Sequence, residues 1–323
     1  MKKKYFILFV LFFLISFSFA QETNKPQKRN IHRLDQNYYI PSRFKDKTIL
    51  ITGAARGIGK WTAVRAAKEG ANVVIMDWLA EGQLVVDSLN KAGFHALFVM
   101  GNIQKDADCD KMIQEAVIKY GKIDYVCLNA GVMDGTYSGT PFKWNEEQRK
   151  LMPATITEAT NEYWDNVFAT NAMGTFKSMR VVLQQFLKQN NGGSIVVVGS
   201  IAGMTGLSGN PAYVSSKFAV NGLVRNAAID YAPYGIRVNS VNMAETQTPM
   251  VDRAESFVKA SVAAGDGFGM GALKTMSLLK YCDSEHRGAF PWEQASTILY
   301  LLSDEASAIT GTIMATDGGW TNY

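Results

Sequence analysis

Cysteine is scarce in this sequence: Cys109, Cys127 and Cys282 are its three cysteines among 323 residues. An odd number of cysteines without close spacing argues against a disulfide framework and a zinc site, and we expect no metal. The Asn-x-Ser/Thr pattern of N-glycosylation is also missing. The formal net charge is only +4, and the basic residues form no stripe along any expected helix. The sequence therefore gives no support to nucleic-acid binding.

The chain otherwise has an ordinary globular composition, 47% hydrophobic and 19% charged. This is enough apolar material for a sizeable core. A single α/β domain of about 250 residues fits such a chain. Most of the surplus residues lie at its amino end.

The first twenty residues have the pattern of a targeting segment. Lysines precede an uncharged apolar run at 5–19, and residues 18–20 have the small-x-small pattern of a signal-peptidase site. Residues 1–20 are therefore predicted to be a signal peptide, with Gln21 as the mature terminus and export to a periplasm or a secretory-pathway lumen. The alternative is an uncleaved anchor that tethers the chain to a membrane through residues 5–20. Basic residues on both sides of the run leave its orientation open.

Residues 21–45 are polar and contain Pro26 and Pro41, which break any helix, so an irregular arm is predicted there. After it, short β-rich runs alternate with helical patterns, which predicts a parallel sheet with helices on both faces. Strands are expected at 48–52, 72–77, 94–100, 123–129, 194–199, 236–242 and 312–316, and helices at 57–70, 79–91, 106–120, 160–189, 211–232 and 291–302. The strands are near-continuous apolar runs, as expected for strands buried on both sides.

Two long segments, 132–159 and 245–290, interrupt this alternation. Each follows the carboxyl end of a predicted strand, which is the edge where open α/β sheets bind ligands. Segments of this length inside a compact domain are more often lids or binding loops than surface decoration. We therefore expect both to shape the substrate pocket.

A glycine-rich turn follows the first predicted strand, with the sequence Thr52-Gly53-Ala54-Ala55-Arg56-Gly57-Ile58-Gly59. Its glycines allow a tight turn and a close approach of the backbone to a ligand, and a helix is expected to begin in the same turn. The free amides of a helix start form a site for a pyrophosphate. The context of strand, turn and helix predicts that this turn binds a dinucleotide.

Asp77 ends the second predicted strand, close to the spacing of about 20 residues at which a carboxylate meets the adenosine ribose. It would repel a 2′-phosphate, which favours NAD. Arg56 could meet that phosphate, which favours NADP. We give Asp77 the larger weight and predict NAD, with NADP as the alternative.

A third pattern lies between Gly199 and Lys217. Ser200 follows an apolar run at 195–198, and Tyr213 and Lys217 are four residues apart, which places them on one face of a helix opened by Pro211. An ammonium beside a phenol favours the phenolate and so lowers a pKa that is about 10 in water. Such a tyrosine can exchange a proton with a hydroxyl or a carbonyl near neutral pH.

Together these residues resemble the short-chain dehydrogenase/reductase family in its short, single-domain branch. The resemblance extends from about residue 47 to the carboxyl end and rests on Gly53, Gly57, Gly59, Asn129, Ala130, Gly131, Asn171, Ser200, Tyr213 and Lys217. It implies a doubly wound Rossmann fold, with a seven-stranded parallel sheet and helices on both faces. It also implies a single catalytic domain over residues 46–323.

The resemblance implies a role for each matching residue. Tyr213 is the implied general acid/base, and Lys217 lowers its pKa and holds the nicotinamide ribose. Ser200 orients and polarises the substrate oxygen. Asn171 holds a water that links Lys217 to solvent. The implied cofactor-binding residues are Gly53, Arg56, Gly57, Ile58, Gly59, Asp77, Asn102, Ile103, Asn129, Ala130, Gly131, Tyr213, Lys217 and Thr248.

The sequence departs from the family pattern in three places. Residues 101–103, Gly-Asn-Ile, replace the usual Asp-Val that meets the adenine, although Asn102 can still do so. Residues 242–244, Asn-Met-Ala, replace the usual Asn-Pro-Gly and leave the geometry of the nicotinamide-side loop open, although Thr248 is expected to meet the carboxamide. The segment before Asn171 is longer than usual, which suggests a modified substrate mouth.

The sequence thus predicts an NAD(P)-dependent oxidoreductase that interconverts a secondary alcohol and a ketone by hydride transfer. The alternative is a catalytically weak dinucleotide sensor or scaffold. By analogy with the family, a homodimer or homotetramer is expected.

Overall fold

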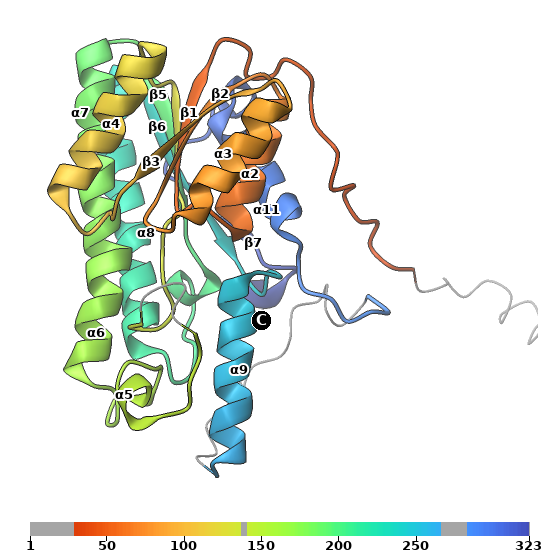
Figure 1. Cartoon of the computed structure of the whole chain (residues 1–323), viewed down its shortest axis with the longest axis vertical. Coiled ribbons are helices and arrows are strands. Elements are labelled where there is room, and N and C mark those ends of the chain that lie inside the picture. The colour runs from red at the N-terminus through yellow and green to blue at the C-terminus, as the bar shows by residue number, and fades with distance from the viewer. Residues whose placement is uncertain (1–28, 137–140, 266–282, 323) are drawn as a thin grey trace, which may run out of the picture.

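A seven-stranded parallel sheet forms the centre of the computed structural model, which describes residues 29–136, 141–265 and 283–322. The strand order is β3-β2-β1-β4-β5-β6-β7 (Figure 1). The strands are β1 (Thr48–Thr52), β2 (Asn72–Asp77), β3 (His95–Met100), β4 (Tyr125–Leu128), β5 (Gly193–Val198), β6 (Ile236–Met243) and β7 (Ile313–Thr316). The predicted fold class, a doubly wound parallel sheet, is confirmed.

Two layers of helices cover the sheet (Figure 1). One layer holds α2 (Gly57–Lys68), α3 (Glu81–Lys91) and α11 (Pro291–Leu302). The other holds α4 (Asp106–Tyr120), α7 (Thr175–Gln189) and α8 (Pro211–Tyr231). Some predicted bounds differ slightly from these, since an apolar pattern does not mark the cap of an element.

The alternation of side chains along each strand explains both layers. Ile49 and Ile51 of β1 belong to the core under α2, α3 and α11, whereas Leu50 belongs to the core under α4, α7 and α8. All three are fully buried. Successive side chains of a strand point to opposite faces, so a strand covered on both sides needs a continuous apolar run.

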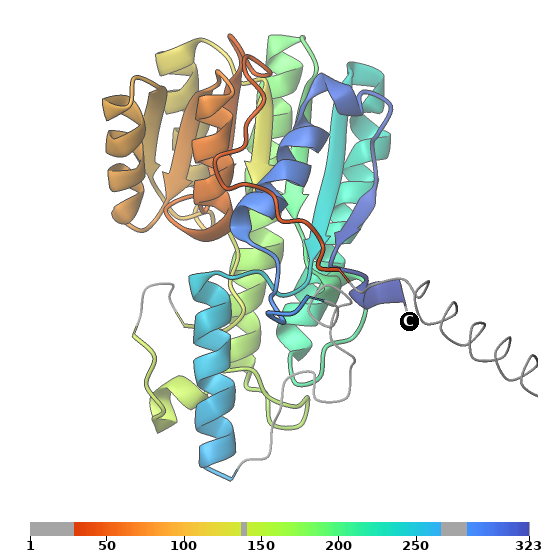
Figure 2. The same cartoon turned by 90° about the vertical axis from the view of Figure 1, so that its right-hand side faces the viewer.

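A short helix and two longer ones extend beyond the carboxyl edge of the sheet: α5 (Glu146–Arg149), α6 (Asn161–Phe168) and α9 (Pro249–Ala263) (Figures 1 and 2). α9 lies within the segment 245–290, which was predicted to be a lid or binding loop and for which no helix was predicted. Only Phe257 and Ser261 of this helix are buried. Two signals were available in the sequence: Pro249 at the first helical position, and apolar residues at helical spacing, which line the cavity (Met250, Val251, Ala254, Phe257 and Val258).

The helix predicted over 160–189 is not continuous. It consists of α6, a π-helical segment Ala169–Gly174 and α7. The π-helical segment contains Asn171. Such segments occur often at functional sites, but the apolar periodicity of the sequence does not distinguish them from an α-helix.

The described part of the N-terminal arm, residues 29–45, crosses the outer face of α11 (Figure 2). It ends in a buried ionic cluster. The Arg43 Nε lies 2.6 Å from Glu69 Oε2, and the Arg65 Nε lies 2.8 Å from Glu69 Oε1. The Glu69 side chain is fully buried between the two guanidinium groups. The arm is therefore fixed to the first helix of the domain through one carboxylate.

No helix in the described part of the chain is long and apolar enough to cross a membrane. The predicted signal peptide or anchor at 1–20 lies outside the described residues, as does Cys282. The division into leader, arm and single domain stays a prediction.

Candidate active site

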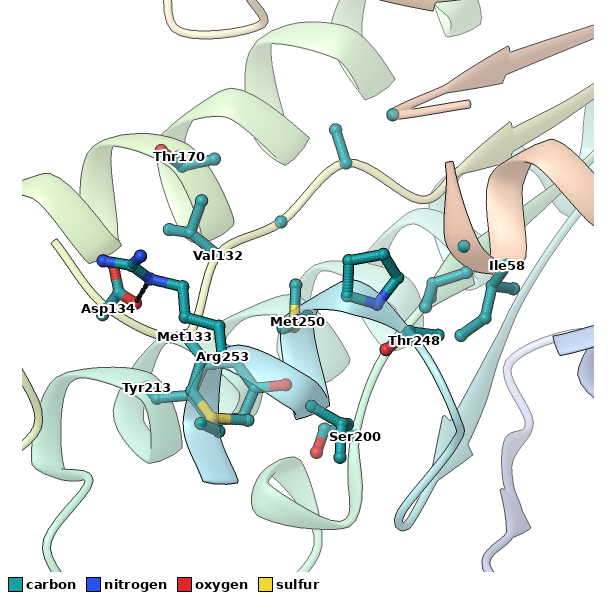
Figure 3. A pocket seen from close by; sticks show the side chains of 18 of the residues that line it. Ile58, Val132, Met133, Asp134, Thr170, Ser200, Tyr213, Thr248, Met250 and Arg253 are labelled. Atoms are coloured by element: carbon teal, nitrogen blue, oxygen red, sulfur yellow. Dashed lines mark hydrogen bonds and ion pairs between the residues drawn. The ribbon is translucent and has the colours of Figure 1, made fainter. Parts of the chain in front are cut away.

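A cavity of about 550 Å³ lies at the carboxyl edge of the sheet, between the glycine-rich turn and α9 (Figure 3). This is the edge at which ligands bind to open α/β sheets. The predicted site residues that line it are Gly53, Arg56, Gly57, Ile58, Asp77, Asn102, Ile103, Asn129, Ala130, Gly131, Ser200, Tyr213, Lys217 and Thr248. Gly59 and Asn171 are not in the lining and support it from behind.

Two glycines of the glycine-rich turn, Gly53 and Gly59, have no room for a side chain. Gly53 has a φ of +66°, and a β-carbon there would lie 2.6 Å from the Cα of Ala130. A β-carbon at Gly59 would lie 2.5 Å from the Gly53 carbonyl oxygen. No side chain of the cap residue Arg56 bonds the first amides of α2, which leaves them available to an anion. This geometry fits the pyrophosphate of a dinucleotide.

The substitution Gly59→Ala is expected to weaken dinucleotide binding by about tenfold or more, because over-packing costs roughly 1–3 kcal/mol. Titration calorimetry with NAD measures the change. Gly222→Ala is the matched control, since a β-carbon at this exposed helical position meets nothing within 4 Å. Equal affinity in Gly59→Ala and the wild type would exclude the turn as the binding site.

Asn129 joins the glycine-rich turn to the end of β4. Its side-chain amide donates to the carbonyl oxygens of Thr52 (3.1 Å) and Gly53 (2.7 Å). The Thr52 hydroxyl in turn accepts from the backbone amides of Asn129 and Ala130. The predicted support of the central sheet by these residues therefore has a geometric basis. Gly131 follows and lines the cavity beside them.

Asp77 holds the same turn from the β2 side. One carboxylate oxygen accepts from the Ala55 amide at 2.9 Å and the other from the Leu79 amide at 3.0 Å. Burial raises the pKa of Asp77, while these two amides and the charge of Arg56 oppose the rise. Asp77 thus fixes the turn and also lines the cavity. Its contact with the ribose stays a prediction.

Asn102 and Ile103, which were predicted to meet the adenine, line the cavity after β3. The Asn102 side-chain oxygen accepts from the Gln104 amide at 2.9 Å, which shapes the turn after β3. Ile103 is 6% exposed and packs so closely on Gly174 that a β-carbon there would lie 2.7 Å from its Cδ1. This part of the cavity lining therefore rests on the π-helical segment.

Ser200 and Tyr213 converge on one part of the cavity (Figure 3). Ser200 follows β5, and Tyr213 lies in the first turn of α8, which Pro211 opens as predicted. Burial raises the pKa of Tyr213 above its ordinary value, and a hydrogen bond with the Ser200 side chain opposes part of this rise. The two hydroxyls can therefore bond one substrate oxygen.

Lys217 lies 5.7 Å from the centroid of the Tyr213 ring and donates to the Val198 carbonyl oxygen at 2.9 Å. Its burial lowers the pKa of Lys217 to about 8. The prediction that this ammonium lowers the pKa of Tyr213 is wrong, because burial raises that pKa. Burial removes water from both groups, which disfavours the phenolate of Tyr213 and the ammonium of Lys217 alike.

Asn171 does not line the cavity and is 1% exposed. Its side-chain oxygen accepts from the Val132 amide at 2.8 Å, and its side-chain nitrogen donates to the Val132 carbonyl (2.9 Å) and the Ser216 hydroxyl (3.0 Å). A β-carbon at Gly131 would lie 3.2 Å from this oxygen and 3.6 Å from the Lys217 Nζ. Asn171 is thus close to Lys217, and its role in a water relay stays a prediction.

Sequence reasoning missed a polar network behind Ser200. The Asn242 side-chain oxygen accepts from the Ser200 amide and from the Asn221 side chain, each at 3.1 Å. Asn242 also donates to the Ser240 hydroxyl at 2.8 Å, which donates to Asn221 at 3.0 Å. All three network residues are almost fully buried. Asn242 in an otherwise apolar strand was the available signal for this network, because a buried side-chain amide needs hydrogen-bond partners.

A second missed feature lies across the mouth of the cavity. The Arg253 Nε on α9 lies 2.6 Å from Asp134 Oδ2, and the same guanidinium donates to the Thr136 hydroxyl at 2.6 Å (Figure 3). The pair joins the two long segments that were predicted to shape the pocket. Thr248 is the N-cap residue of α9, makes no side-chain cap hydrogen bond and lies next to Gly57.

Comparisons with known proteins agree with this geometry. A family model described as short chain dehydrogenase matches residues 47–259. A 3beta-hydroxysteroid dehydrogenase of Mediterraneibacter gnavus is 37% identical over 290 residues, which are 88% of this chain and 98% of that protein. A cyclohexanol dehydrogenase of an Acinetobacter species is 32% identical over 284 residues, 88% of this chain and 98% of that protein.

Solved structures give the same result for the fold. The crystal structure of levodione reductase has a TM-score of 0.72 and 26% identity, with 85% of this chain and 98% of that chain covered.

Proposed function

This chain belongs to the short chain dehydrogenase family, and we therefore propose that it interconverts a secondary alcohol and a ketone. We propose a nicotinamide dinucleotide as its cofactor and Tyr213 as its general acid/base. The observation that carries the proposal is the convergence of Tyr213, Ser200 and Lys217 beside the glycine-rich turn. The dinucleotide, when bound, accepts or donates a hydride at its nicotinamide ring. The glycine-rich turn and Thr248 would hold its two ends.

In the oxidation direction, Tyr213 accepts the proton of the substrate hydroxyl. Ser200 donates a hydrogen bond to the same oxygen and keeps it within reach. Lys217, whose position is fixed by the Val198 carbonyl, holds the ribose, and its positive charge favours the Tyr213 phenolate that accepts this proton. Asn171 holds the water through which Lys217 reaches solvent. In the reduction direction, Tyr213 returns the proton to the carbonyl oxygen.

We propose NAD as the preferred dinucleotide. Asp77 lines the cavity at the end of β2, and its negative charge would repel a 2′-phosphate. Arg56 lines the cavity nearby and is the group that would favour NADP.

An alicyclic secondary alcohol is the proposed substrate. The lining of the cavity includes several large apolar side chains, among them Met133, Met152, Leu207 and Met250. Methionine side chains adapt to bulky apolar rings. The relatives named above are a hydroxysteroid dehydrogenase and a cyclohexanol dehydrogenase, and a further one is a cyclopentanol dehydrogenase. Their names support turnover, and no structural observation favours the alternative of a dinucleotide sensor.

A substrate panel tests the proposal. Wild-type protein is incubated with NAD or NADP and with cyclopentanol, cyclohexanol, a 3β-hydroxysteroid and linear secondary alcohols. Reduction of the nicotinamide is followed by absorbance. We expect the highest kcat/KM with NAD and a ring alcohol. Binding of NAD without turnover across the panel, in either direction, would favour the sensor.

We also propose that the chain is exported through residues 1–20, or retained at a membrane by them, and that it forms a homodimer or homotetramer. Large apolar side chains exposed along α6 to α8 support the oligomer: Trp164, Met173, Phe176 and Phe218 are 38%, 50%, 40% and 48% exposed.

A further inference from the structure

The N-terminal arm lies outside the residues that the family model matches, yet it contacts a segment close to the cavity. This segment, residues 283–290, directly precedes α11. The Asn30 side-chain nitrogen donates to the Ser284 hydroxyl at 2.7 Å, and the Ser284 amide donates back to the Asn30 side-chain oxygen at 3.0 Å. Next to this pair, Arg33 forms an ion pair with Glu285. The arm thus bonds side chains more than 250 positions away.

Aromatic packing continues the contact along the arm. The Arg33 guanidinium lies 5.7 Å from the centroid of the Phe290 ring, and Phe290 stacks on Trp292 at 4.4 Å. The Trp292 indole nitrogen donates to the Leu34 carbonyl oxygen at 3.0 Å. Both ends of the 283–290 segment are therefore held by residues 30–34.

Inside the 283–290 segment, buried ion pairs join Arg287 to Asp283 and to Glu293 of α11. Arg287 is 5% exposed and bonds both carboxylate oxygens of Glu293, at 2.8 and 3.2 Å. Its Nε also lies 3.4 Å from the buried Asp283 carboxylate. A displacement at Ser284 is therefore transmitted to the residues after Arg287.

The far side of the 283–290 segment contacts the cavity wall. The Gln247 amide donates to the Ala289 carbonyl at 2.9 Å, and the Ala289 amide donates to the Glu245 carbonyl at 3.0 Å. Glu245, Thr246 and Thr248 all line the cavity, at the point where the sequence departs from the family pattern after β6. The 283–290 segment is thus the layer between the arm and this wall.

We propose that the N-terminal arm is a positioning element for the active site. Asn30 and Arg33 fix the 283–290 segment, and this segment fixes the backbone of residues 245–248 on the nicotinamide side of the cavity. The positioning of the wall stands on the contacts above, whereas its effect on dinucleotide binding rests on the proposed function. The loop after β6 has Met243-Ala244 where the family pattern has Pro-Gly, so it lacks the proline that would restrict its backbone. The contacts of the arm restrain this loop instead.

Hydrogen exchange of the protein without ligand tests the proposal directly. The double variant Asn30→Ala/Arg33→Ala is compared with the wild type by mass spectrometry. We expect exchange about fivefold faster in peptides that contain Gln247 and Ala289. The loss of two exposed polar contacts lowers the free energy of local opening only modestly. The matched control is Asn37→Ala, since this arm asparagine contacts Lys68 of α2 instead of the 283–290 segment. The control is expected to exchange like the wild type.

Titration with NAD gives the second readout. We expect the double variant to bind NAD about threefold to fivefold more weakly, with KM for NAD raised and kcat nearly unchanged. Unchanged exchange at Gln247 and Ala289 in the double variant would overturn the proposal, and so would equal acceleration in Asn37→Ala. If the wild type binds no dinucleotide, the proposed function fails, while the exchange result still decides the role of the arm.

Discussion

Tyr213→Phe is expected to lower kcat about a thousandfold, within the range of 10²–10⁴ that a positioned proton donor contributes. The variant removes one hydroxyl and leaves the ring, which packs against Tyr163, Val167 and Ala212. The site then has no group to accept the proton of the alcohol, since Ser200 is too weak a base. Affinity for NAD is expected to stay within about twofold of the wild-type value, because the turn that holds the pyrophosphate is untouched.

Tyr163→Phe is the matched control for this substitution. Tyr163 is fully buried in the same cluster as Tyr213, but it does not line the cavity. Initial rates of the two variants and the wild type, measured with saturating NAD and a turned-over alcohol, give the comparison. Wild-type kcat in Tyr213→Phe would remove Tyr213 from the mechanism. An equal loss in both variants would indicate that the cluster is damaged and not the chemistry.

Glu69→Ala is expected to destabilise the fold by about 3–5 kcal/mol, because it leaves two buried guanidinium groups without their shared carboxylate. The Arg43 and Arg65 side chains are each 6% exposed in the structure. Burying a charge without a partner costs far more than an exposed pair gains. Urea denaturation followed by circular dichroism measures the difference in free energy of unfolding.

Glu305→Ala is the control for this effect. Glu305 lies 3.9 Å from the same Arg43 but is 54% exposed, so its removal is expected to change the stability by less than about 0.5 kcal/mol. A loss in Glu69→Ala as small as that of the control would mean that water reaches both arginines. The cluster would then not be the anchor of the arm.

The sheet and most helices could be predicted because burial leaves a direct mark on the sequence. Strands such as Thr48–Thr52 are buried at every position and apolar between their terminal threonines, since both faces are covered. α9 was missed although its apolar residues recur at helical spacing, because they face the cavity and only Phe257 and Ser261 of the helix are buried. The contacts of the arm could not be predicted either, since Asn30 and Ser284 are polar residues far apart in the sequence and no periodicity relates them.

The candidate site was predictable where its geometry is local. Tyr213 and Lys217 share a helix, and the glycines share a turn, so spacing alone relates them. The direction of the Tyr213 pKa was not predictable, because it depends on how completely packing removes water from both groups. The network of Asn221, Ser240 and Asn242 joins a helix to a strand, and its partners become visible only once the chain is folded.

The π-helical segment at 169–174 makes the fold sensitive to insertions and deletions near Asn171. One surplus residue in a helical turn rotates everything that follows by ~100° about the helix axis. α6 can therefore direct Tyr163 and Val167 toward α8, while α7 directs Val182 and Phe186 toward the sheet. Because Asn171 sits at the point of rotation, losing or gaining a single amino acid there would misalign two packing surfaces and withdraw this amide from Val132 in one step.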